Sequence, residues 1–166
     1  MLSEKKSISD FWLIGINYRK SDTTLRGRYA INNEQYDKIL KAAPEFGLDE
    51  LFILSTCNRT EIYGFTKEPL LLMSLLCNFT EGAQEDFIQA AYQKNGKEAL
   101  SHIFHLAGGL DSQILGDYEI IFQLKTAINF ASERGFIGQF TDRFFKTVLP
   151  SCRAIRSKTH LTEGTV

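Results

Sequence analysis

The stretch Leu51–Gly64 reads Leu-Phe-Ile-Leu-Ser-Thr-Cys-Asn-Arg-Thr-Glu-Ile-Tyr-Gly, and the interpretation of the chain starts from it. Four apolar residues are followed abruptly by hydroxyls, a thiol, an amide, a guanidinium and a carboxylate. A short apolar run of this kind is typical of a buried strand. We expect a strand over 51–56, a tight turn at 57–60 and a second strand over 61–65 that pairs with the first. Because a strand end is rigid, polar side chains there can be aimed accurately at a ligand.

The surrounding sequence supplies the other elements of an α+β fold. Apolar runs predict strands over 11–17 and 87–93, and helical spacing predicts helices over 33–43 and 68–78. The resulting order, β-α-β-β-α-β, is that of the ferredoxin-like split βαβ sandwich. After Asn95-Gly96 the pattern becomes helical only. We therefore expect a ferredoxin-like α+β lobe at 1–95, which carries the cysteine, and a helical lobe at 96–166.

Three helices are expected in the second lobe. Leu100, Ile103, Phe104 and Ala107 form one apolar stripe, which ends at Gly108-Gly109. A second helix would be capped by Asp117. The third would span 141–160 with a kink at Pro150. The inward face of the second helix is expected to carry Ile121, Leu124, Ile128 and Ala131. That of the third helix is expected to carry Phe144, Val148, Cys152 and Ile155.

Composition narrows the class of protein. The 166 residues are 43% hydrophobic and 23% charged, as in ordinary globular domains, and the net charge of −1 gives no overall basic field. The early apolar run Phe11–Ile16 is too short to cross a membrane. Three widely spaced cysteines without a Cys-x-x-Cys favour neither a disulfide framework nor a zinc site, which fits a reducing, cytoplasmic compartment.

Cys57 is the candidate nucleophile. Burial in apolar surroundings raises the pKa of a thiol, whereas nearby cations and hydrogen-bond donors lower it, and the thiolate is the reactive form. Thr56, Asn58 and Arg59 supply such groups, although an inert buried cysteine is the alternative. Arg59 could bind a substrate carboxylate through bidentate hydrogen bonds, or it could simply pair with Glu61 at the surface.

Further candidates lie in the helical part. His102 and His105 fall on the helix face opposite the apolar stripe, where they would be solvated or would offer an imidazole for proton transfer. Ser112 and Asp117, in a glycine-interrupted connector, could bind a polar ligand or only form a turn. Basic residues near the end form a solvated face or contact RNA phosphates; they are Arg143, Lys146, Arg153, Arg156 and Lys158.

The residues Ser55–Tyr63, together with Gly109-Leu110-Asp111-Ser112 and Gly116, resemble glutamyl-tRNA reductase, and the likeness extends over nearly the whole chain. The resemblance implies that Cys57 attacks the ester joining glutamate to tRNA. The thioester is then reduced by NADPH to glutamate-1-semialdehyde for tetrapyrrole (haem) biosynthesis. It also implies that His102 is the histidine needed for full activity. Thr56, Asn58, Arg59 and Ser112 would bind the glutamyl group.

One segment departs from the family pattern. Where the family reads Gly-Glu-Pro-Gln-Ile-Leu-Gly-Gln, this chain has Gly-Asp-Tyr-Glu-Ile-Ile-Phe-Gln at 116–123. Asp117 and Gln123 preserve the acid and the amide, whereas Tyr118 and Glu119 replace proline and glutamine. The resemblance implies that these four positions also belong to the substrate-binding wall.

The resemblance also carries expectations about what lies beyond the chain. The family enzyme continues into a Rossmann domain that binds NADPH and a helical domain through which it forms a homodimer. This chain has no Gly-x-Gly-x-x-Gly, so we expect the cofactor to be bound by a domain absent from it. Glutamyl-tRNA and the downstream semialdehyde aminomutase are the expected partners. A stand-alone cysteine acyl transferase or hydrolase, and a non-catalytic RNA-binding module, are the competing hypotheses.

Overall fold

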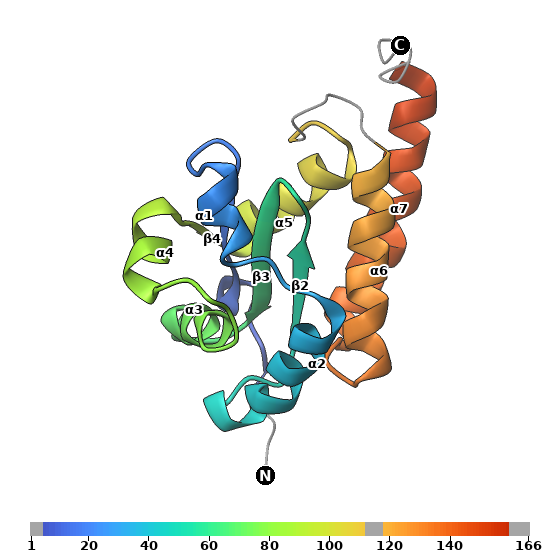
Figure 1. Cartoon of the computed structure of the whole chain (residues 1–166). Helices are drawn as coiled ribbons and strands as arrows, with labels where there is room; N and C mark the ends of the chain where they lie inside the picture. Colours follow the sequence, from blue (N-terminus) through green and yellow to red (C-terminus); the bar gives the residue numbers. More distant parts are fainter. Residues whose placement is uncertain (1–4, 112–117, 160–166) are drawn as a thin grey trace.

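The computed structural model describes residues 5–111 and 118–159, and Figure 1 shows a small sheet surrounded by helices. Along the chain the elements are η1 (Ile8–Asp10), β1 (Phe11–Asn17), α1 (Thr23–Gly27), α2 (Asn33–Ala42), η2 (Ala43–Phe46), β2 (Leu51–Ser55), β3 (Arg59–Phe65), α3 (Leu70–Cys77), α4 (Gln84–Ala90), β4 (Tyr92–Asn95), α5 (Gly96–Ala107), α6 (Glu119–Glu133) and α7 (Gln139–Thr159).

The four strands form one antiparallel sheet in the order β2-β3-β1-β4. This order places the first and third strands in the centre, as the split βαβ connection requires. The predicted fold class is therefore confirmed, and β2 and β3 form the predicted hairpin through a turn at residues 56–58. In the middle of the sheet Gly15 of β1 lies between Glu61 of β3 and Tyr92 of β4.

The two faces of the sheet are covered by different helices. Successive residues of a strand point to opposite faces, so Glu61 and Gly64 of β3 face in opposite directions. The side chain of Glu61 meets His102 of α5, whereas the space above Gly64 is filled by Leu72 of α3. Helix α5 therefore covers one face and α3 the other.

The segments on either side of residue 95 share a single hydrophobic core. One cluster of buried residues includes Leu13 and Tyr63 from the sheet, Leu106 from α5, Leu124 from α6 and Cys152 from α7. The boundary between the two predicted lobes stays a prediction. It falls where β4 passes directly into α5.

Helix α6 closes the β2 edge of the sheet. The backbone N–H of Ile53 donates to the hydroxyl of Tyr36, which donates in turn to the carbonyl of Ala127 in α6, each at 2.9 Å. The N–H of Leu51 donates to the carbonyl of Phe136, just after α6, at 3.1 Å. An edge strand normally presents unpaired backbone groups to other chains; here Tyr36 of α2 and the carbonyl of Phe136 accept from two of them.

Two predictions about secondary structure are wrong. The expected strand over 87–93 is the helix α4 followed by the short strand β4. In α5 the buried face is displaced from the predicted stripe by one residue: Phe104 is exposed, whereas His102 and Leu106 are buried. The predicted inward face of α6 is confirmed, because all four of its residues are buried.

Helix α7 matches its prediction in part. Val148 and Cys152 are buried, but Phe145 rather than Phe144 is the fully buried aromatic residue, and Pro150 lies inside the helix. The predicted cap Asp117 lies outside the described residues. No helix in the described part of the chain has the length and apolarity needed to cross a membrane.

Candidate functional site

Cys57 lies in the turn between β2 and β3, and its side chain is exposed. The backbone N–H of Thr56 donates to the carbonyl of Arg59 at 2.8 Å, and the Thr56 hydroxyl accepts from the N–H of Asn58 at 3.2 Å. These bonds define the shape of the turn without using the thiol. Cys57 is therefore not the inert buried cysteine that the sequence left open.

Hydrogen bonds also connect the turn to the loop that follows β1 and to helix α1. The carbonyl of Asn58 accepts from the N–H of Tyr18 at 2.9 Å, and the carbonyl of Cys57 accepts from Nε of Arg26 at 3.1 Å. Two elements thus hold the backbone on either side of the thiol. A cysteine on a turn supported in this way has a defined position relative to the sheet.

Arg59, the first residue of β3, is buried, with only 2% of its surface exposed. Its Nη1 lies 2.9 Å from Oε1 of Glu61 and 3.1 Å from Oδ2 of Asp111, and its Nη2 donates to the Asp111 carbonyl. Burial alone would lower the pKa of Arg59. The opposing influence of Glu61, followed by Tyr92 and Asp111, is larger, so the pKa is raised above its ordinary value. The guanidinium is therefore permanently charged and is held by carboxylates of the protein itself.

Glu61 is the centre of this buried cluster; the sequence indicated it only as a surface partner of Arg59, and the pair is in fact buried. Its carboxylate accepts hydrogen bonds from Arg59, from Nε2 of His102 at 2.9 Å, and from the hydroxyls of Tyr63 and Tyr92. Burial would raise the pKa of Glu61, but His102, Arg59 and Tyr63 together hold it at about 2. Glu61 is thus ionised although it is fully buried.

Gly15 makes room for the Glu61 side chain. A Cβ atom at position 15 would lie 2.7 Å from Cγ of Glu61 and 2.9 Å from the carbonyl oxygen of Thr60. Because Gly15 lacks a side chain, the Glu61 carboxylate can extend across β1 and reach Tyr92 on β4. A glycine in the middle of a strand often marks such a close approach, and this was the available signal for the cluster.

His102 is buried on the inner face of α5, which corrects the expectation that it faces solvent. Because the ionised Glu61 can only accept hydrogen bonds, Nε2 of His102 carries a proton. Its other nitrogen, Nδ1, lies 4.0 Å from Oδ2 of Asp111, whose Oδ1 binds Arg19 at 2.9 Å. His105 is exposed and contacts the Ser101 carbonyl through Nδ1.

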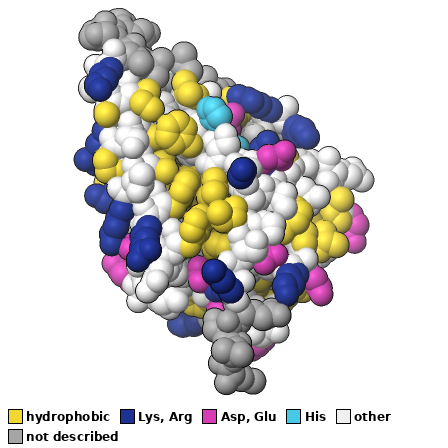
Figure 2. Space-filling model, turned by 180° about the vertical axis from the view of Figure 1, so that it is seen from behind, with side chains coloured by type: hydrophobic (Ala, Val, Ile, Leu, Met, Phe, Trp, Pro, Cys, Tyr) yellow, Lys and Arg dark blue, Asp and Glu magenta, His cyan; other side chains and the backbone are white. Residues whose placement is uncertain are grey.

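An open cleft of about 690 Å³ borders this cluster. His102 and Asp111 line it. Figure 2 shows histidine, acidic and basic side chains close together on the face opposite that of Figure 1. The other residues that line the cleft are polar or charged apart from Leu110; they are Arg19, Lys94, Lys97, Glu98, Ser101 and His105.

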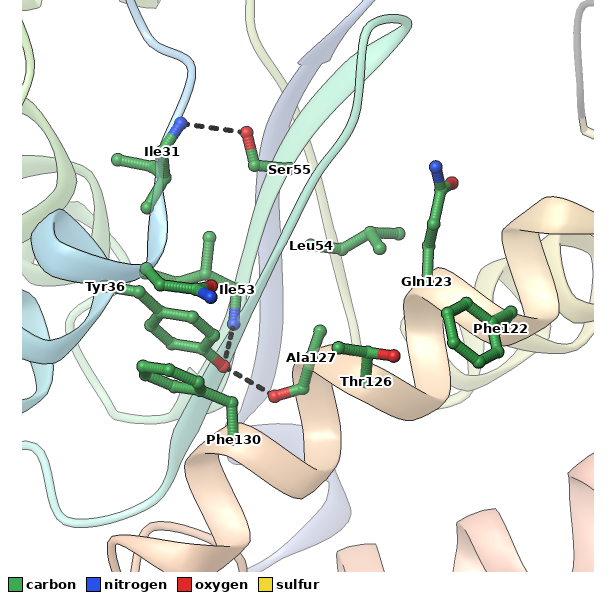
Figure 3. A pocket seen from close by; sticks show the side chains of 11 residues that line it. Ile31, Tyr36, Ile53, Leu54, Ser55, Phe122, Gln123, Thr126, Ala127 and Phe130 are labelled. Carbon is green, nitrogen blue, oxygen red and sulfur yellow. Dashed lines mark hydrogen bonds between the residues drawn. The ribbon is translucent and has the colours of Figure 1, made fainter.

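The remaining predicted residues lie elsewhere. Gln123 of α6 lines a separate cavity beside the end of β2 (Figure 3), and Tyr118 and Glu119 are exposed where α6 begins. Ser112 and Asp117 lie outside the described residues. The structure therefore brings Thr56, Cys57 and Asn58 together on one turn. It connects Arg59 and His102 through Glu61.

Together these features define a class: an α+β domain with an exposed cysteine in a strand-end turn, two residues before an arginine that belongs to a buried cluster with a glutamate and a histidine. An exposed cysteine on a defined turn is a candidate nucleophile for covalent acyl transfer. The chain belongs to the family described as "Glutamyl-tRNAGlu reductase, N-terminal domain", whose sequence model matches residues 14–159. The resemblance inferred from the sequence is confirmed.

Individual relatives agree with this assignment. The chain is 42% identical over 154 residues to "Glutamyl-tRNA reductase 2" of Flavobacterium johnsoniae and to "Glutamyl-tRNA reductase" of Christiangramia forsetii, with 93% of the chain covered in each case. The solved structure of glutamyl-tRNA reductase from Methanopyrus kandleri matches with a TM-score of 0.76 and 25% identity over 95% of the chain. The chain spans only 36%, 37% and 37% of the lengths of these three proteins.

Proposed function

We propose that this chain is the substrate-binding and acyl-transfer domain of a glutamyl-tRNA reductase, with Cys57 as the nucleophile. The observation that carries the proposal is the exposed thiol of Cys57, on a turn held by hydrogen bonds and two residues before Arg59 of the buried Arg59–Glu61–His102 cluster, in a chain of this family. A site of this composition suits an ester whose acyl group is acidic.

The first step would convert an oxygen ester into a thioester. The sulfur of Cys57 attacks the ester carbonyl of glutamyl-tRNA, the carbon–oxygen bond to the ribose breaks, and the ribose hydroxyl leaves with a proton. A thioester carbonyl is more electrophilic than an oxygen ester, so one difficult step becomes two easier ones. When bound to the complete enzyme, NADPH supplies the hydride that reduces the thioester to glutamate-1-semialdehyde.

No residue of this chain is assigned to the cofactor. The described sheet is entirely antiparallel, whereas dinucleotides bind at the glycine-rich turn of a parallel βαβ unit. We place NADPH on another part of the enzyme, consistent with the chain spanning 36% of the Flavobacterium relative.

His102 and Arg59 would act from the buried side of the site. Glu61 fixes Nε2 of His102, which leaves Nδ1 as the nitrogen available to move a proton. Arg59 already holds the carboxylate of Asp111, so a substrate carboxylate would share the guanidinium with Asp111 or take its place. Thr56 and Asn58 would contact the glutamyl group from the turn.

The wider context follows from the same proposal. The product would enter tetrapyrrole biosynthesis in the cytoplasm. The complete enzyme would be a homodimer that passes the aldehyde to the aminomutase. Ser112, Asp117, Tyr118, Glu119 and Gln123 are proposed as the remaining wall of the substrate site.

The test is the intact mass of the chain after incubation with glutamyl-tRNA in the absence of NADPH, followed by acid quench. We expect a glutamyl adduct on the wild type and on Cys77→Ser, and none on Cys57→Ser. Rapid release of free glutamate with no adduct would instead favour a hydrolase. Intact, tightly bound glutamyl-tRNA with no adduct would favour a non-catalytic RNA-binding module.

A further inference from the structure

A second, smaller cavity lies beside the end of β2, between the start of α2 and α6 (Figure 3). Its volume is about 180 Å³, below the ~300 Å³ at which pockets for drug-sized ligands begin. It therefore suits a fragment about the size of one heteroaromatic ring system. The Arg59–Glu61–His102 cluster does not line it.

The rim of the cavity carries an aromatic ring that is largely exposed to solvent. Phe122 of α6 is 72% exposed, which makes it the most exposed large hydrophobic side chain among residues 5–111 and 118–159. Exposing a phenylalanine to water forgoes the free energy that its burial provides. By contrast, Phe130 on the same helix stacks on Tyr36 at 4.5 Å between ring centroids. Phe122 is thus available to stack on a ligand.

Polar groups without partners converge on the same cavity. The side chains of Asn33, Gln123 and Thr126 line it, and none of them makes a hydrogen bond within the described part of the chain. In Figure 3 Gln123 extends from α6 towards the end of β2. Asn and Gln amides offer a donor and an acceptor side by side, which is the pattern that reads the edge of adenine. An aromatic face with such amides is how proteins hold an unstacked base.

The cavity also lies close to the proposed nucleophile. Ser55 lines it, with its hydroxyl accepting from the N–H of Ile31 at 2.9 Å, and Cys57 follows two residues later. Two residues span at most roughly 7 Å, the length of fully extended chain. In an aminoacyl-tRNA the ester is on the ribose of the terminal adenosine, so only one sugar separates its carbonyl from an adenine ring.

We propose that this cavity binds the terminal adenine of the RNA, with the base stacked on Phe122 and its edge read by Gln123 and Asn33. The inference rests on the proposed function, because it takes the ester attacked by Cys57 to be that of a 3′-adenosine. The pocket holds the leaving group in place and so directs the ester carbonyl to the sulfur.

The test compares three acyl donors by intact mass: 3′-O-glutamyl-adenosine, 3′-O-glutamyl-cytidine and an α-thioester of glutamate without a nucleoside. We expect adenosine to be preferred over cytidine. Phe122→Ala should slow transfer from the adenosine ester by about tenfold, since a base on an aromatic ring contributes that much. Phe122→Tyr should retain the preference. Ile88→Ala, which removes a similarly exposed apolar group from α4, should change nothing.

The donors separate the two proposals. If the thioester acylates Cys57 but adenosine and cytidine esters react equally, or Phe122→Ala has no effect, the adenine site is refuted while the nucleophile stands. If none of the donors acylates Cys57, the proposed function fails. Free adenosine 5′-monophosphate that binds through Phe122 without slowing the adenosine ester would assign the cavity to a free nucleotide and overturn the inference.

Discussion

Replacing Gly15 by alanine should destabilise the protein by about 2 kcal/mol, the middle of the range for an overpacked core position. The added Cβ would lie 2.7 Å from Cγ of Glu61 and 2.9 Å from the carbonyl oxygen of Thr60. Thr60 is paired with Ile16 in the β1–β3 register, so its carbonyl cannot retreat without disturbing the ladder. Glu61 cannot retreat cheaply either, because four side chains hold its carboxylate.

The measurement is urea unfolding with thermal unfolding as a second probe. For a domain of this size about 2 kcal/mol corresponds to a melting temperature lower by about 4–8 °C. Gly27→Ala is the matched control, since no atom lies within 4 Å of the added Cβ and the residue is helical. That variant should be neutral or stabilised by up to ~1 kcal/mol. A Gly15→Ala protein as stable as the wild type would refute the close-packing argument.

Three further outcomes are expected. The pKa of Glu61 falls from 4.5 to about 2 on folding. Its contribution of about 3 kcal/mol to the free energy of unfolding is therefore complete above pH 4.5 and is lost as the pH falls towards 2. In urea unfolding over that pH interval, Glu61→Gln should lose less stability than the wild type, and equal losses would contradict the assignment. Tyr36→Phe leaves two buried backbone groups without their partner and should cost about 1–3 kcal/mol in urea unfolding, whereas Tyr18→Phe, which loses only an exposed contact, should cost far less. Iodoacetamide at pH 8 should alkylate the exposed Cys57 well before the half-buried Cys77, whose pKa burial raises to about 11; mass spectrometry showing equal labelling would argue against this difference.

Much of the sheet could be predicted because its strands have recognisable local sequence patterns. The apolar runs at 11–17 and 51–55, and the polar turn between β2 and β3, are visible without any knowledge of tertiary contacts. The fourth strand was misplaced because Phe87, Ile88 and Ala90 read as one apolar run. In the folded chain Phe87 and Ala90 are buried three residues apart while Ile88 is 53% exposed, which is helical spacing.

The site was predictable only where its residues are neighbours in sequence. Thr56, Cys57 and Asn58 could be grouped from the motif, and Glu61 could be named as a partner of Arg59, but the second partner, Asp111, lies beyond α5 and could not. His102 was placed on the wrong face because a polar residue on a buried face breaks the apolar periodicity. Its hydrogen bond with Glu61, which makes that burial tolerable, is a tertiary contact.

The closure of the β2 edge has a consequence for how the protein is made. One partner of this edge, the carbonyl of Phe136 that accepts from the N–H of Leu51, comes late in the chain. At about 5–20 residues per second, a ribosome takes roughly 4 to 16 seconds to go from residue 55 to residue 136, and until then the N–H of Leu51 lacks this partner. During that interval β2 could pair with a neighbouring nascent chain, so yield in the cell should depend on the rate of translation between residues 55 and 136.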